Sequence, residues 1–417
     1  MAINAASSAA TSAAFGSNAY IVNKIKKQKE EAAKKAAAVN RAQAEARKAA
    51  AQKQKSLTSK NTGTKKTTDQ TSQTQTQTPY TAQTLDISKI SYQAVAVLTN
   101  GDAVHLEEVA TNIAWEENEN ELATRLNLTI RDVDLGNGKG RLATKLSLCT
   151  AVYLYYDIGN GQEEAFRGTI WEWKHSQIHD DEIVITAYDL LYYLQKSEDY
   201  GMFSAGQSTK AVCQSVLSNW GVPLSRYDAP SMTHEKLALK TKKVSAILTE
   251  VLDMARFNVG MRYFIRSTKG NCEIIGPGTN DTIWTFSAET NLITSSDQYS
   301  MTNIITKIVI MGKEDKDGEQ RPPVEAIEYG KTEYGTIQKI MSLGSKTLET
   351  AQAEAKQTIA KNGTPTRKLH LVSPDFPVVR KGDRIRVVTD NVNGYFCVLT
   401  VSHNATNQQM QMEVEPI

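Results

Sequence analysis

The 417-residue sequence predicts a mainly β fold with an α+β insert, preceded by an N-terminal arm that is helical or disordered. Short segments of alternating apolar residues recur from residue 90 onward, separated by glycine-rich turns. Two segments in the middle of the chain instead place apolar residues at helical spacing. All five Trp and seven of the eight Phe follow residue 100, so the capacity to bury apolar area lies in the C-terminal four-fifths.

Charge is divided unevenly along the chain. Residues 1–80 hold 14 Lys and Arg against 4 Asp and Glu, a formal charge of +10, whereas residues 81–417 hold 34 against 42, or −8. No stretch reaches the ~18 apolar residues that cross a bilayer, and the N-terminus lacks the basic-then-apolar order of a secretory signal. We therefore expect a protein that is made in the cytoplasm and has no membrane anchor.

The N-terminal arm, residues 1–84, has two parts. Residues 20–55 alternate Ala with Lys, Arg, Gln and Glu, which are strong helix formers. Between Lys26 and Thr84 the only large apolar residues are Val39, Leu57 and Tyr80, so an apolar helix face is nearly absent. Residues 56–84 are Thr, Ser or Gln at 19 of 29 positions, which predicts a flexible linker. A basic helix attracts nucleic acid through charge, but this one lacks aromatic residues that stack on bases. We expect a solvated or partner-docking arm and do not expect nucleic-acid binding.

Residues 85–188 are expected to form a first β domain. A hairpin is predicted around Asn100-Gly101, because this dipeptide favours a tight turn between two strands. Four further strand-like segments follow at short intervals, separated by turn clusters at residues 136–138 and 158–161. Such spacing is typical of an antiparallel sandwich or barrel.

The next two regions are expected to be an α+β module at residues 189–280 and a second β domain at residues 281–417. In the module, apolar spacing predicts one helix at residues 209–221 and another at residues 244–255. The second β domain begins with strands, contains an inserted helix at residues 346–361, and closes with four strand-like segments.

One candidate metal pair is visible in the sequence. His175 and His179, followed by Asp180 and Asp181, have a spacing that fits one face of a helix. Their flanking residues alternate as strands, however, so the segment is interpreted as a hairpin tip. Two histidines without a third ligand and a second shell rarely hold a transition metal, so no metal site is expected.

The cysteines give little sign of chemistry. Cys149, Cys213, Cys272 and Cys397 are spread over about 250 residues, with no CxxC pair and no His at a zinc-ligand interval. We expect four buried, reduced thiols. Cys397 and His403 could act as nucleophile and base, but both lie in one strand-like segment, where a buried Cys is the simpler explanation.

The remaining catalytic patterns are weak as well. The carboxylate pairs Glu107-Glu108 and Glu116-Glu117 suit glycoside hydrolysis only if held about 5–9 Å apart, which sequence spacing cannot show. The glycines of residues 135–140 resemble a phosphate cradle, but strands flank them on both sides. No GxxxxGK[ST], HExxH or GxSxG sequence is present. We expect no enzyme activity and no cofactor.

Several sequence phrases follow one another over roughly residues 85–417. They are ITAYDLLYYLQKSEDYGMF, STKAVCQSVLSNWGVP, TNIITKIVIMG, EYGTIQKI, AQAEAKQTIAKNG, RKGDRIRVV and YFCVLTVSHNATNQQMQMEVEP. In this order they resemble the baseplate hub proteins of contractile phage tails and phage-tail-like particles. These are of the XkdQ and YqbQ type, related to late control protein D and to the N-terminal part of type VI secretion spikes. None of the phrases holds a catalytic constellation, and the N-terminal arm departs from the family pattern.

The resemblance implies a homotrimer in which each chain contributes two barrel domains similar to the tail-tube subunit. Three chains then present six barrels, so that a threefold central spike can seat beneath a sixfold tail tube. The implied partners are the tail tube protein and the central spike protein, together with tape-measure and baseplate wedge proteins. The implied location is the baseplate of a virion or tail-like particle, assembled in the bacterial host cytoplasm.

Two alternative functions stay open at this point. A tail-associated enzyme that degrades the cell wall would need a carboxylate or Cys/His constellation in a cleft. A nucleic-acid-binding protein would act through the basic arm, with a steep salt dependence that disappears when residues 1–80 are removed. We also hypothesise that the basic arm, residues 1–80, threads into the lumen of the hub or docks on a tape-measure or spike partner. The sequence does not distinguish a DNA-carrying phage from a headless bacteriocin.

Overall fold

The computed structural model describes residues 87–136, 138, 140–176, 181–259, 262–312, 321–344 and 346–417. All of these belong to one compact unit, Pro79–Ile417. The predicted helix and linker of the N-terminal arm, together with His179 and Asp180, lie outside the described residues. Within the described part of the chain, no helix is long and apolar enough to cross a membrane.

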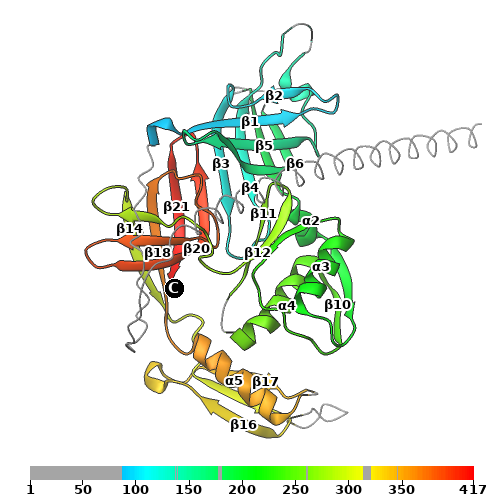
Figure 1. The fold of residues 1–417 in the computed structure, drawn as a ribbon, viewed down its shortest axis with the longest axis vertical. Helices are drawn as coiled ribbons and strands as arrows, with labels where there is room; N and C mark the ends of the chain where they lie inside the picture. The colour runs from blue at the N-terminus through cyan, green and yellow to red at the C-terminus, as the bar shows by residue number, and fades with distance from the viewer. Residues whose placement is uncertain are drawn as a thin grey trace, which may run out of the picture. The chain divides into compact units, whose positions relative to one another are not determined.

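The first β region confirms the predicted strands and the hairpin at Asn100-Gly101. Each strand pairs antiparallel with its neighbours in the order β3-β4-β7-β6-β5-β1-β2. Figure 1 shows strands β1 to β6 grouped together. Its core comes from alternating positions such as Leu126, Leu128 and Ile130, which are fully buried on one strand. The elements are η1 (Ile87–Lys89), β1 (Ser91–Val97), β2 (Ala103–His105), β3 (Ala110–Glu117), β4 (Arg125–Arg131), η2 (Leu142–Thr144), β5 (Ala151–Asp157), β6 (Gln162–Ser176) and β7 (Glu182–Tyr188).

One predicted strand begins later than expected, and this corrects the expectation of four buried thiols. The segment predicted as a strand from Leu146 is extended only from Ala151, where β5 begins. Cys149 lies before that point with a φ of 66°, which is outside the range of a β-strand. Its side chain is exposed, whereas Cys213, Cys272 and Cys397 are buried and unpaired.

The α+β module follows, and both predicted helices are present. Ser208 caps α3, accepting a hydrogen bond from the N–H of Ala211 at 3.2 Å. The apolar faces of α3 and α4 share one core, to which they contribute Leu217 and Leu248. The elements are α2 (Leu191–Lys196), β8 (Glu198–Phe203), α3 (Thr209–Asn219), β9 (Leu224–Tyr227), β10 (Leu237–Lys243), α4 (Val244–Val259), β11 (Phe264–Thr268) and β12 (Asn271–Ile275).

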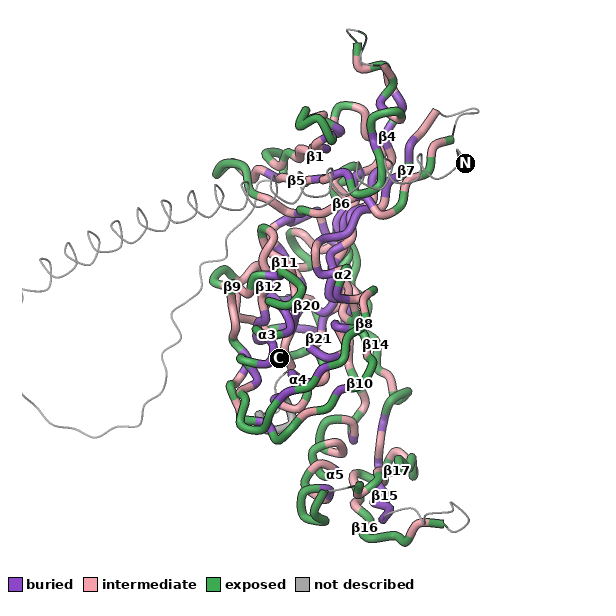
Figure 2. The backbone as a smooth tube through the Cα atoms, turned by 90° about the vertical axis from the view of Figure 1, so that its right-hand side faces the viewer, coloured by how far each residue is buried: buried purple, intermediate pink, exposed green. Residues whose placement is uncertain are grey.

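The second β region contains an inserted sheet and helix. Strands β15, β16 and β17 form a separate three-stranded sheet, on which α5 packs through Ala351 and Ala355 against Ile308 and Ile310. Figure 2 shows that β16 and α5 are mostly exposed or half-buried. The elements are β13 (Trp284–Ser287), β14 (Thr294–Ser300), β15 (Lys307–Met311), β16 (Val324–Tyr329), η3 (Thr332–Tyr334), β17 (Gln338–Ser342), α5 (Leu348–Asn362), β18 (Thr366–Pro374), β19 (Arg384–Val388), β20 (Asn393–Asn404) and β21 (Gln409–Pro416).

The two β regions share one sheet. Strand β3 pairs antiparallel with β20, in a register that sets Glu117 opposite Val401 and Ala114 opposite Asn404. The result is a 13-stranded sheet whose main path runs from β14 to β2. The mainly β fold with an α+β module is thus confirmed, and strand pairing is continuous between the first and second β regions.

Candidate functional site: a buried charged junction

A short loop between β18 and β19 brings three regions of the chain together. We call residues 380–383, with the sequence Arg-Lys-Gly-Asp, the junction loop. It contacts Glu117 at the end of β3, Arg266 on β11, and Val398 on β20. The first β region, the α+β module and the second β region therefore meet at this loop.

Glu117 is the buried anion of the junction, and its side chain is only 4% exposed. It pairs with the Arg380 guanidinium, and it accepts the backbone N–H of Lys381 at 2.9 Å and the Thr124 hydroxyl at 3.3 Å. Burial works to raise the pKa of this carboxyl, but Arg380, Lys381 and Arg266 outweigh burial and lower it to about 2. Glu117 is therefore ionised at neutral pH.

Lys381 is a buried cation whose ammonium group has no salt-bridge partner among the described residues. Its Nζ donates to the backbone carbonyls of Glu121 at 2.6 Å and Asn118 at 3.2 Å. Burial lowers its pKa to about 8, although Glu117 and Asp189 act in the opposite direction. The ammonium thus holds the turn between β3 and β4 against the junction loop.

A second buried ion pair ties the junction loop to the α+β module. Arg266 donates to Asp383 Oδ1 at 2.9 Å, to the carbonyl of Lys381 at 3.0 Å, and to Glu273 at 3.1 Å. The other oxygen of Asp383 accepts the backbone N–H of Arg380 at 2.9 Å. The junction is therefore closed by charge-assisted hydrogen bonds on both sides, which is the arrangement that buried charges require.

Gly382 occupies a position where a side chain would collide with its neighbours. Its φ is +90°, and an added Cβ would lie 2.9 Å from Ile275 Cδ1 and 3.3 Å from a ring carbon of Phe264. Its carbonyl accepts the N–H of Gly278 at 2.8 Å, and its own N–H donates to Val398 at 2.8 Å. Glycine allows the backbone of the loop to lie directly on the apolar surface of β11 and β12.

A second polar cluster lies where β1, β3 and β20 meet. His403 Nδ1 lies 2.6 Å from Asp375 Oδ1, and its Nε2 lies 3.0 Å from the carbonyl of Val379. Tyr92 donates to the other oxygen of Asp375 at 2.5 Å, and the Trp115 ring stacks on His403 at 4.5 Å. Burial and the neighbouring Asp375 raise the pKa of Tyr92, so its hydroxyl stays protonated.

A cavity of about 380 Å³ adjoins the junction. Its charged lining includes Glu119, Arg262 and Lys381. Glu119 is already paired with Arg262 at 2.6 Å and with Lys368 at 3.0 Å, and Lys381 is bonded to backbone carbonyls. These lining groups are therefore engaged in holding the surrounding elements together.

The structure does not assemble the catalytic pairs that the sequence suggests. Both ring nitrogens of His403 are held by Asp375 and Val379, so neither faces Cys397. Cys397 is 1% exposed, and burial raises the pKa of its thiol to about 12, so the thiol stays protonated.

Three members of the two carboxylate pairs are engaged in structural contacts. Glu107 accepts the backbone N–H of Ala94 at 3.0 Å. Glu116 pairs with Arg125, and Glu117 is part of the junction. At the start of the glycine-rich segment, Asp134 accepts the N–H of Gly136 at 2.7 Å, so its side chain stabilises a turn there.

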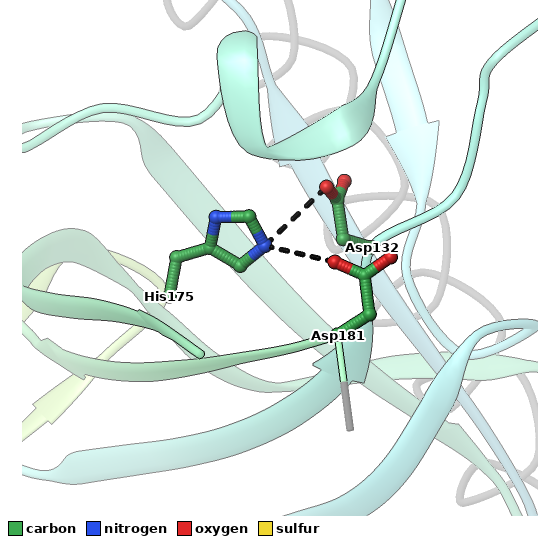
Figure 3. A group of neighbouring side chains, drawn as sticks. All are labelled: Asp132, His175 and Asp181. Carbon is green, nitrogen blue, oxygen red and sulfur yellow. Dashed lines mark hydrogen bonds and ion pairs between the residues drawn. The ribbon is translucent and has the colours of Figure 1, made fainter. Parts of the chain in front are cut away.

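The structure does assemble a cluster around His175, the one described histidine of the candidate metal pair. Its Nε2 faces Asp181, which was noted in the sequence, and Asp132, which was not (Figure 3). Asp132 lies 43 positions earlier, and no local spacing pattern connects it to His175. The junction residues were missed for the same reason, although residues 380–383 begin one of the family-like phrases.

Comparison with known proteins agrees with the resemblance seen in the sequence. Residues 113–415 match the model of the YQBQ-like family. The XkdQ protein of the phage-like element PBSX of Bacillus subtilis is 20% identical over 241 residues, covering 55% of this chain and 72% of XkdQ. The uncharacterised protein YqbQ of the same organism is 20% identical over 227 residues, covering 52% of this chain and 68% of YqbQ.

Solved structures share the fold at low sequence identity. A tail protein from Neisseria meningitidis superposes with a TM-score of 0.59 at 12% identity, covering 78% of this chain and 96% of that protein. A tail protein of prophage MuSo2 from Shewanella oneidensis superposes with a TM-score of 0.57 at 13% identity, covering 78% and 98%.

Proposed function

The chain belongs to the YQBQ-like family of phage tail and baseplate proteins, and from this premise we propose that it is a baseplate hub. As a homotrimer in a contractile phage tail or tail-like particle, it joins the sixfold tail tube to the threefold central spike. Its immediate partners are the tube protein and the spike protein. Its location is the baseplate, and its role is structural rather than catalytic.

The observation that carries this proposal is the continuity between the two β regions. Strands β3 and β20 are hydrogen-bonded neighbours in one sheet, and the junction loop adds buried ion pairs beside this contact. A protein that bears load between a tube and a spike needs its parts fixed to one another. Backbone pairing and desolvated charge pairs resist rotation of one region against the other far better than a flexible linker would.

The state of the polar groups supports a structural role over an enzymatic one. Glu117, Asp383 and His403 are each held by hydrogen-bond partners on both sides. A general acid, base or nucleophile must instead direct a reactive atom toward a substrate. The buried charged and polar groups of the junction loop and of His403 therefore serve to connect elements.

The test is assembly of particles in a producing strain with and without the full-length protein. We expect that particles formed without it lack the joint between tube and spike when viewed by electron microscopy. Light scattering of the purified full-length chain should give the mass of a trimer. Complete, spiked particles in the absence of the protein would contradict the hub role, whereas a monomeric mass together with unspiked particles would contradict only the preformed trimer.

A further inference from the structure

Three adjacent strands each place one metal-ligating side chain at the same end of the sheet. Strands β4, β7 and β6 are neighbours in that order. Asp132 follows β4, Asp181 precedes β7, and His175 lies near the end of β6. The N–H of Asp132 donates to the carbonyl of Asp181 at 2.8 Å, which extends the pairing of β4 and β7 and brings the two carboxylates together. Figure 3 shows both carboxylates directed toward the same ring nitrogen.

We propose that Asp132, His175 and Asp181 form a Zn²⁺ site. His175 Nε2 lies 3.4 Å from Asp132 Oδ2 and 3.2 Å from Asp181 Oδ1, and all three ligand atoms lie within 4.8 Å of one another. A charge-assisted N–H···O bond is usually about 2.7–2.9 Å long. Two ligand atoms at about 2.0–2.1 Å from a tetrahedral zinc are roughly 3.3–3.4 Å apart. The two separations measured from His175 Nε2 are thus close to the spacing of two ligands on one zinc ion.

Neighbouring residues donate hydrogen bonds to the two carboxylates, and the sequence alone did not show these contacts. Asp132 Oδ1 accepts the N–H of Ala143 at 2.8 Å, and its Oδ2 accepts from Arg141 Nε at 2.7 Å. Arg141 also pairs with Asp181, but through Oδ2, which leaves Oδ1 directed at His175. Such outer contacts fix the orientation of metal ligands. Arg141 therefore orients both carboxylates. Asp181 turns its other oxygen toward the ring, whereas Asp132 Oδ2 both accepts from Arg141 and faces the ring.

Burial and charge are also suitable for a metal ion. The side chain of Asp132 is 1% exposed and that of His175 is 12% exposed, whereas Asp181 and Arg141 are about half exposed. The ion would thus have two anchored ligands and an open side for entry. Two carboxylates and one guanidinium leave one net negative charge beside the imidazole of His175. A nitrogen ligand with two carboxylates suits zinc better than Ca²⁺ or Mg²⁺, which prefer oxygen ligands alone.

The consequence of binding is a cross-link among three strands. Zinc would connect β6 to β7 and to the end of β4, and through Asp132 to the segment that begins η2. With three protein ligands, the fourth position is open to water or to a side chain of a partner. The expected effect is a higher melting temperature of the zinc-loaded protein than of the zinc-free protein.

The experiment is calorimetric titration of the metal-stripped full-length chain with zinc chloride. The exposed thiol is removed first by Cys149→Ser in all samples, because a free thiol is a competing zinc ligand. We expect one zinc per chain, and an affinity at least about tenfold lower in His175→Ala and in Asp181→Asn. His370→Ala is the matched control, because that ring is more exposed and faces one carboxylate, Glu413, at 3.7 Å. Its affinity should equal that of the parent.

Spectroscopy and the Asp181→Asn variant distinguish zinc bound at this site from zinc bound by other side chains. Cobalt(II) in the site should give the visible absorption of a four- or five-coordinate ion with nitrogen and oxygen ligands, without a thiolate charge-transfer band. Circular dichroism confirms that each variant is folded, and Asp181→Asn, at a half-exposed position, serves if His175→Ala does not fold. The proposal is overturned if the parent binds no zinc, or if folded His175→Ala or Asp181→Asn binds zinc as tightly as the parent.

Discussion

The carboxylate of Glu117 accepts a hydrogen bond from the backbone N–H of Lys381 at 2.9 Å, although 264 positions of sequence separate the two residues. This contact joins the last residue of β3 to the loop that precedes β19. Both residues are buried, at 3% and 2% exposure. The stability of the protein should therefore be unusually sensitive to changes at this one place.

Replacing Glu117 by Gln should destabilise the protein strongly. The substitution leaves Arg380 and Lys381 without their buried anion, and breaking a buried pair costs about 3–5 kcal/mol. The folded pKa of about 2 lies below the unfolded value of about 4.3, so this stabilisation is present above pH 4.3 and is lost as pH falls toward 2. Urea unfolding at pH 7 and pH 3 measures the difference, which should shrink at the lower pH.

The matched control for this substitution is Glu116→Gln on the neighbouring residue. Glu116 also pairs with an arginine, Arg125, but both side chains are partly exposed, and such pairs contribute about 0–1 kcal/mol. If both substitutions lowered the free energy of unfolding equally, burial of the Glu117 pair would have no special importance.

Lys381→Met should change how stability depends on alkaline pH. The folded pKa of Lys381, about 8, is below the unfolded value of about 10.4, so the unfolded chain binds more protons between these values. Wild-type stability should therefore rise relative to the variant across this window, on the order of 1–3 kcal/mol. Urea unfolding at pH 7.5 and pH 10.5 provides the measurement.

Lys368→Met is the control for that experiment. Burial lowers the pKa of Lys368, but hydrogen bonds to Glu413 and Glu119 outweigh burial and raise it. A raised folded pKa gives stabilisation that is present below the unfolded value and lost as pH rises, so the slope should have the opposite sign. The free energy of unfolding should depend on pH with opposite signs for the two lysines. The same sign for both would contradict the lowered pKa of Lys381.

Gly382→Ala should lower the free energy of unfolding more than Gly101→Ala does, although the two glycines have the same φ. Gly101 and Gly382 both have a φ of +90°, which strains any residue with a Cβ by about 1–3 kcal/mol. An added Cβ meets nothing within 4 Å at Gly101, but it meets Ile275 at 2.9 Å at Gly382. The collision of the added Cβ with Ile275 should therefore destabilise Gly382→Ala by about a further 1–3 kcal/mol, a loss that Gly101→Ala does not have. Thermal unfolding of both variants tests this, and equal losses would show that the loop can move away.

The four thiols should react in two groups. Cys149 is exposed, whereas burial raises the pKa of Cys213 and Cys397 to about 12 and also raises that of Cys272. A thiol reagent should modify one cysteine rapidly in the native protein and the other three only after denaturation. Cys149→Ser should remove the rapid reaction. Rapid labelling of any remaining cysteine in that variant would contradict the buried positions.

The elements that the sequence predicted are those with a local signal. Val212 and Val216 recur at helical spacing in α3, and Asn100-Gly101 marks the turn between β1 and β2. Strand β14 was not predicted, because its sequence TSSDQYS has no apolar alternation and nearly all of its residues are exposed. It becomes a strand by pairing with β18, a contact that local propensity does not reveal.

The sequence by itself determined the mainly β fold, the helices of the module and the family, because alternation, helical spacing and phrase order are properties of neighbouring residues. Only the tertiary structure decided that β3 pairs with β20, that Glu117 is buried against the junction loop, and that Asp132 joins His175. These contacts connect residues 43 to about 290 positions apart, and their stability comes from desolvation and partner geometry. Desolvation and partner geometry arise only when the chain folds, so no pattern of residue spacing could have predicted these contacts.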